Sequence, residues 1–135
     1  MTLARTITAM LLCCAVFISA PGYSETLNGN HLLQMCNITV KVLSGTAIDD
    51  EASVSESMMF DAGICIGMIA GISQTLITLK KSDINRSLAC LPDRPMTNEQ
   101  AARMIVRYLE ANRQRLHLPG AELALYAFRE AFPCR

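Results

Sequence analysis

The sequence has few of the side chains on which most active sites depend. Its 135 residues contain two histidines and no tryptophan, and aromatic residues make up 5% of the chain. The motifs H-E-x-x-H and G-x-S-x-G are missing, and so is a glycine-rich phosphate loop. Two histidines are too few for most metal sites. We therefore expect no enzyme and no cofactor, and binding becomes the leading class of function.

The chain also lacks an excess of charge and an alternating pattern of apolar residues. Lysine and arginine together number 12, as do aspartate and glutamate, so the formal net charge is zero. Proteins that bind nucleic acid or anionic membranes carry a basic surface, so this balance predicts neither partner. No segment alternates with the period of two that marks a strand, so the predicted fold is all-α, with about four main helices.

Residues 1–24 have the pattern of a secretory signal peptide. Arg5 precedes an apolar segment over residues 7–18, and small residues suitable for cleavage follow. We predict cleavage after Ala20 or Ser24, which leaves residues 25–135 as a single exported domain with no membrane association. An uncleaved anchor is the alternative.

Four of the six cysteines remain once the signal peptide is removed. An even number in a small exported domain predicts disulfides, and four cysteines allow three connectivities. Zinc binding is disfavoured because the sequence has no C-x-x-C pair. The remaining cysteines are Cys36, Cys65, Cys90 and Cys134.

The mature chain is organised around an uncharged stretch over residues 62–79. It predicts a central helix over about residues 55–79, with a stripe of three glycines at four-residue spacing: Gly63, Gly67 and Gly71. Glycine weakens a helix, so we expect another element to pack closely against this stripe. A membrane span is the alternative, because G-x-x-x-G also mediates helix pairing in lipid.

Two helices are predicted from capping residues and helical spacing. One begins at Asn28 or Asn30, with His31 at the surface, and its apolar residues are Leu32, Met35, Cys36, Val40 and Leu43. The other begins at the capping box formed by Thr97 and Gln100. Its apolar face comprises Ala101, Met104, Ile105, Tyr108 and Leu109. A basic stripe is predicted to be a solvated face, and it comprises Arg103, Arg107, Arg113 and Arg115.

A last helix is predicted to open with Pro119 in its first turn and to stop at Pro133. Its predicted buried residues are Leu118, Ala121, Leu125, Phe128 and Phe132. Residues 44–54 and 82–95 form the two long connections. The first carries the acidic run 49–51, which we expect to be solvated, and the second contains Cys90 and ends with two prolines.

Several segments, in order along the mature chain, resemble the Rap/Tai family of immunity proteins against type VI secretion amidase effectors. They are L-N-G-N-H-L-L-Q-M-C at 27–36, C-I-G-M-I-A-G at 65–71, A-C-L-P at 89–92, Q-x7-Y-L-E-x-N at 100–112, and H-L-P-G-A-E-L-A-L-Y-A-F-R-E-A-F-P-C at 117–134. The chain departs from the family pattern at Met68 and in its long acidic loop, 45–54.

This resemblance implies an all-α periplasmic protein, often a dimer, that binds a peptidoglycan-cleaving amidase and blocks its cysteine active site. The alternative is a structural or regulatory envelope protein with the same fold and no toxin partner. Hydrolytic activity of the purified protein would contradict both hypotheses.

The sequence also predicts the disulfide pairing and the contact surface. Helix order favours the disulfides Cys36–Cys65 and Cys90–Cys134, because the first pair joins two neighbouring helices and the second ties a connection to the C-terminus. An amidase groove is best entered by an ordered loop, so residues 80–94 are the predicted contact surface. The predicted contacts are Lys81, Asp83, Asn85 and Arg86. A plain connection between helices is the alternative for this loop, and the acidic run 49–51 is the rival contact surface.

Overall fold

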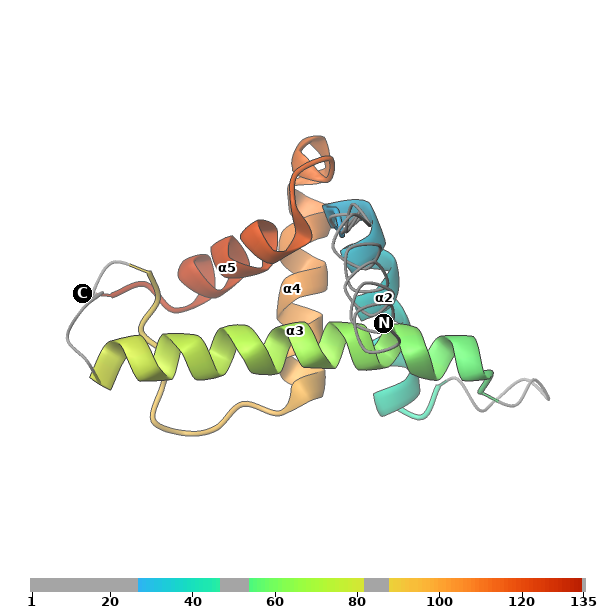
Figure 1. Ribbon diagram of the computed structural model, residues 1–135, viewed down its shortest axis with the longest axis horizontal. Coiled ribbons are helices and arrows are strands. Elements are labelled where there is room, and N and C mark those ends of the chain that lie inside the picture. The colour runs from blue at the N-terminus through green and yellow to red at the C-terminus, as the bar shows by residue number, and fades with distance from the viewer. Residues whose placement is uncertain (1–26, 47–53, 82–87, 135) are drawn as a thin grey trace, which may run out of the picture.

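The computed structural model describes residues 27–46, 54–81 and 88–134, and the regular secondary structure in these ranges is helical (Figure 1). The elements are α2 (Gly29–Leu43), α3 (Glu56–Lys81), α4 (Asn98–Ala111), a 3-10 turn η1 (Arg113–Arg115) and α5 (Gly120–Ala131). No strand occurs in these ranges, and an isolated bridge joins Asn28 to Pro119. The all-α prediction is therefore confirmed. The predicted signal peptide and the acidic run 49–51 lie outside the described residues.

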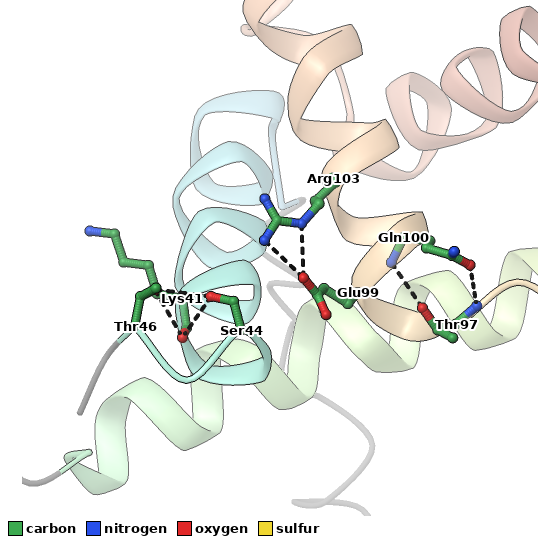
Figure 2. Close-up of polar contacts among 7 residues, drawn as sticks. All are labelled: Lys41, Ser44, Thr46, Thr97, Glu99, Gln100 and Arg103. Carbon is green, nitrogen blue, oxygen red and sulfur yellow. Dashed lines mark hydrogen bonds and ion pairs between the residues drawn. The ribbon is translucent and has the colours of Figure 1, made fainter. Parts of the chain in front are cut away.

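Local side-chain hydrogen bonds fix where α2 and α4 begin. The side chain of Asn28 accepts hydrogen bonds from the amides of Asn30 and His31, at 3.0 and 3.2 Å. At α4 the Gln100 amide donates to Thr97 Oγ1 at 3.2 Å, and the Thr97 amide donates to Gln100 Oε1 at 3.1 Å (Figure 2). These bonds satisfy amides that have no partner within the helix, so both predicted helix starts are confirmed.

The core lies where α2, α4 and α5 meet the inner face of α3. Its largest fully buried apolar side chains are Phe128, Leu32, Ile105, Leu109 and Leu123. The inner face of α3 contributes Ala62, Cys65, Ile69 and Leu76. Buried Thr39 donates from Oγ1 to the carbonyl of Met35 at 2.9 Å, so this polar group in the α2–α3 contact is satisfied.

Both predicted disulfides are present. Cys36 on α2 joins Cys65 on α3, and both residues are fully buried. Cys90 joins Cys134, so the connection before α4 is tied to the segment after α5. The two bridges therefore do different jobs: one links two helices inside the core, and the other holds two irregular segments together.

A close backbone approach lies at Gly29 and Gly120. A Cβ atom on Gly29 would meet the Leu123 side chain and would lie 2.9 Å from Leu116 Cα, and one on Gly120 would lie 2.8 Å from the Leu27 carbonyl oxygen. The Gly120 amide donates to that same oxygen at 2.6 Å. No side chain fits between these segments, so α2 and the start of α5 can meet only through glycine.

The expectation for the glycine stripe on α3 is wrong. A Cβ atom on Gly63, Gly67 or Gly71 would meet nothing within 4 Å, and all three residues are exposed. The buried residues of α3 lie on the opposite side, so the stripe faces away from the bundle. The apolar residues of α3 occur on all of its sides, so their spacing alone does not reveal which side of the helix faces the core.

The longest helix, α3, crosses α2 and α4, and α5 lies along one side of it (Figure 1). It is also the one helix in the described ranges that is long and apolar enough to cross a membrane, although core helices pass the same test. Only 22% of its most apolar window is buried within the chain. An unusually apolar outer surface therefore remains on α3.

The predicted buried face of α5 also needs correction. Phe128 is buried as predicted, but Ala121 is exposed and Leu118, Leu125 and Phe132 are only half-buried. The buried residues are instead Gly120, Leu123, Ala124, Ala127 and Phe128. Small residues on this side let α5 pack closely against α2 and α4, while Ala121 and Leu125 face a groove beside α3. Pro119 caps α5 and is not its first helical residue.

Candidate partner-binding site

The candidate binding segment connects α3 to α4, and the structure describes both of its ends. Lys81 is the last residue of α3 and is exposed. The described chain resumes at Leu88, so the predicted contacts Asp83, Asn85 and Arg86 lie outside the described residues. What the structure defines is the two described ends of this connection, at Lys81 and Leu88.

The C-terminal end of the connection is fixed to the end of α5. Besides the Cys90–Cys134 bridge, the Cys90 amide donates to the carbonyl oxygen of Phe132 at 2.8 Å. The neighbouring Ala89 is buried, with 5% of its surface exposed. A covalent bond, a backbone hydrogen bond and a buried side chain thus hold adjacent residues of the connection in place.

A second contact ties the connection to the last turn of α3. Lys80 Nζ lies 3.4 Å from Asp93 Oδ1 and donates to the Leu91 carbonyl oxygen at 3.3 Å. Both charged groups are largely exposed, so this ion pair contributes little to stability. Its structural consequence is that residues 91–93 lie beside the end of α3, which brings both ends of the connection together. No local pattern in the sequence predicts this contact, because Lys80 and Asp93 lie 13 residues apart.

The surface around these contacts is hollow and mixed in polarity. A depression of about 420 Å³ is lined by Ile77, Lys80, Lys81, Leu91, Pro92 and Asp93. Charged side chains stand beside apolar ones in this depression.

The basic residues of α4 and η1 do not act as one stripe. Arg103 pairs with Glu99 on the previous turn, with Nη2 2.8 Å from Oε1 (Figure 2). Arg115 lies over the ring of Tyr126, 4.7 Å from its centroid, and donates to Tyr108 Oη at 3.2 Å. Burial raises the pKa of Tyr108, and the nearby Arg115 charge partly opposes that effect. Arg107 and Arg113 remain exposed, as the prediction of a solvated face requires.

The described residues offer little for catalysis. No group of three His, Cys, Asp or Glu side chains within them could hold a metal ion. Cys36, Cys65, Cys90 and Cys134 form disulfides, so none of these four is available as a nucleophile.

The decisive comparison is with known protein families. A model of the Rap1a immunity proteins matches residues 28–134. The chain belongs to this family. No curated protein and no solved structure matches the chain at a significant level. Membership makes the chain an immunity protein directed against a toxin effector and indicates a non-catalytic inhibitor, in agreement with the resemblance found in the sequence.

Proposed function

We propose that this immunity protein acts in the periplasm, where it binds a peptidoglycan amidase delivered by type VI secretion and occludes the cysteine active site of that enzyme. The pairing of the four mature cysteines supports export, because such bonds persist in oxidising compartments. The signal-peptide pattern of residues 1–24 points the same way. The homodimer implied by the resemblance belongs to the same proposal.

The contact surface in this proposal is the connection from Lys80 to Arg94, with Lys81, Asp83, Asn85 and Arg86 as the contacts. The observation that carries it is the fixation of residues 88–93 at two places, through Cys90 and through the Lys80–Asp93 contact. Segments fixed before binding lose less conformational entropy on association, so such a connection suits an inhibitor that enters a groove.

Calorimetry with the cognate amidase tests the contact surface. Replacing Asp83, Asn85 and Arg86 together with alanine should weaken binding at least about tenfold, because truncation of central contacts typically costs more than about 1.4 kcal/mol. Arg107→Ala on the exposed face of α4 is the matched control and should bind normally. A folded triple variant that binds as tightly as the parent would redirect attention to the acidic run 49–51.

Export can be tested separately from binding. Cells that receive the amidase in the periplasm should survive when they produce the full chain and lyse when they produce residues 25–135 without the signal peptide. Equal protection by both forms would contradict a periplasmic site of action. Failure of both forms to protect, with no binding to the amidase, would favour the alternative of an envelope protein without a toxin partner.

A further inference from the structure

A narrow pocket lies between α3 and the segment 91–98 that leads into α4. Its lining includes buried apolar residues of two helices, Ile69 at 3% exposure on α3 and Ala101 at 2% on α4. The volume of the pocket is about 200 Å³. An apolar cavity of about 150 Å³ is large enough to bind benzene, so this pocket can accept one large apolar side chain.

The wall of the pocket opposite α3 is held in place within the single chain. Its apolar residues are Leu91, Pro92, Pro95 and Met96. The Cys90–Cys134 bridge and the hydrogen bond from Lys80 to the Leu91 carbonyl oxygen anchor the start of this wall, and the capping box of α4 fixes its end. The two prolines restrict the backbone between these anchors. Because the wall is ordered before a partner arrives, little conformational entropy is lost when the pocket is filled.

Polar side chains from both sides border this apolar pocket. Ser73 and Gln74 belong to α3, and Asn98 is the first residue of α4. Within the described ranges these three side chains form no hydrogen bond. The amide groups of Gln74 and Asn98 can each donate and accept, so they match the N–H and C=O groups of an extended peptide backbone. An acyl chain would offer these amide groups no partner.

The charged groups beside the pocket favour an acidic occupant. Arg94 lines the pocket itself. The depression of about 420 Å³ shares three lining residues with the pocket and adds Lys80, Lys81 and Asp93, so the two hollows form one groove. Lys80 pairs with Asp93, which leaves the positive charges of Arg94 and Lys81. Because α3 carries no charge between residues 62 and 79, it does not offset these two charges.

We infer that this groove binds an extended, acidic segment of the effector, with one large apolar side chain in the pocket and a carboxylate paired with Arg94. The inference rests on the proposed function, because its occupant belongs to the amidase. It adds a contact in the opposite direction: the connection enters the enzyme, and a segment of the enzyme enters this protein. Anchors of this kind, seated in a pocket with a polar rim, carry much of the binding energy of protein interfaces.

Filling the pocket from within tests whether an effector side chain enters it. Ser73 is half-buried and lines the pocket, so Ser73→Phe places a ring where that side chain would lie. Calorimetry with the cognate amidase should show binding at least about tenfold weaker than that of the parent. Glu110→Phe adds the same ring at an exposed position of α4 and should bind like the parent. A folded Ser73→Phe variant that binds as tightly as the parent overturns the inference.

The dependence of affinity on salt tests the acidic character of the occupant. Arg94 is exposed, so Arg94→Gln should leave the thermal melt unchanged. It should weaken amidase binding a few-fold and make the affinity fall less between low and high salt, because one charge pair is lost. Arg94→Lys retains the charge and should keep the salt dependence of the parent. If the affinity of Arg94→Gln depends on salt as strongly as that of the parent, the occupant does not pair with Arg94 and the inference is wrong.

Photo-cross-linking identifies the occupant directly. The four mature cysteines are paired, so Gln74→Cys introduces one reactive thiol beside the pocket, to which a benzophenone label can be attached. Mass spectrometry of the cross-linked complex should find one segment of the amidase, with an aspartate or glutamate near a large apolar residue. The same label on Glu110→Cys should capture far less amidase. Equal yields from the two labels, or attachment to a segment without an acidic residue, would contradict the inference.

Failure of this inference and failure of the proposed function give different results. An amidase that binds the parent, Ser73→Phe and Arg94→Gln equally tightly overturns this inference and leaves the proposed function standing. An amidase that does not bind the parent overturns both. A lipid surface is the remaining occupant to be tested. Binding of the parent to phosphatidylglycerol vesicles, abolished by Arg94→Gln while amidase binding is unchanged, would overturn the inference in favour of anionic headgroups.

Discussion

Two sets of glycines in this molecule have opposite surroundings. Gly29 and Gly120 lie where α2 meets the start of α5, and a Cβ atom on either would come within 3 Å of backbone atoms from another segment. Gly63, Gly67 and Gly71 lie on the outer face of α3, where a Cβ atom would meet nothing within 4 Å. Regular glycine spacing on a helix therefore does not by itself indicate close packing within the chain.

Removing the disulfide that joins α2 to α3 should have the largest effect on stability. The Cys36–Cys65 bridge joins α3 to α2 across 29 residues, for which chain entropy alone suggests about 4 kcal/mol. We expect the double variant Cys36→Ala, Cys65→Ala to lose at least that much free energy of unfolding, because it also empties a fully buried site. Urea denaturation provides the measurement.

The paired control removes the other bridge. Cys90→Ala with Cys134→Ala opens a loop of 44 residues, for which chain entropy again suggests about 4 kcal/mol. It should leave the core intact, since both residues are only half-buried, so its total loss should be smaller than that of the Cys36 and Cys65 variant. It should release the connection and so reduce affinity for the amidase. If this variant loses more stability than the variant lacking Cys36–Cys65, the bridge between α2 and α3 is not the main covalent support of the fold.

A side chain at the close contact between α2 and the start of α5 should have the next largest effect on stability. Gly120→Ala places a methyl group 2.8 Å from the Leu27 carbonyl oxygen and 3.3 Å from Leu32 Cβ. Backbone atoms must move to accommodate it, so we expect a loss of about 1–3 kcal/mol in thermal or urea denaturation. Unchanged stability would show that α2 and α5 can separate without cost, which would remove one side of the comparison.

A substitution on the outer face of α3 should instead raise the free energy of unfolding. Gly63→Ala adds a methyl group in open space and improves helix propensity, so the free energy of unfolding should rise by up to about 1 kcal/mol. The measurement belongs at low protein concentration, where a single chain predominates. Destabilisation by this variant would mean that another element covers Gly63.

How much of this could be predicted depends on whether the cause is local. Helix starts at Asn28 and Thr97 depend on hydrogen bonds within a few residues, so their sequence signal is direct. The orientation of α3 depends on tertiary packing, because that helix has apolar residues on all of its sides and its sequence pattern does not single out one face. On α5, Leu123 and Leu125 are equally apolar, and only the adjacent Ala124 and Ala127 distinguish the side that packs closely.

The binding site shows the same division. The Cys90–Cys134 pairing followed from the order of the helices, and the structure contains it. The Lys80–Asp93 contact joins residues 13 apart through the path of the connection, which no local pattern encodes. The contacts predicted at Asp83, Asn85 and Arg86 remain predictions, to be decided by the binding measurement described above.

The smallest expected effect is on how the free energy of unfolding depends on pH. Tyr108 belongs to the packed region and is 7% exposed, whereas the outer face of α3 carries no charged group between residues 62 and 79. Burial raises the pKa of Tyr108 above its ordinary value of 10.0. The unfolded chain therefore releases this proton at a lower pH than the folded chain does. The contribution of Tyr108 to stability is complete below about pH 10 and is lost as the pH rises through the folded-state pKa.

Tyr108→Phe has no proton to release, so its unfolding free energy should fall less steeply above about pH 10 than that of the parent. Urea midpoints measured between about pH 9 and 11 provide the test, with Phe60→Asp as a control that should keep the slope of the parent. Parallel profiles for Tyr108→Phe and the parent would show that the hydroxyl of Tyr108 is as well solvated in the folded chain as in the unfolded one.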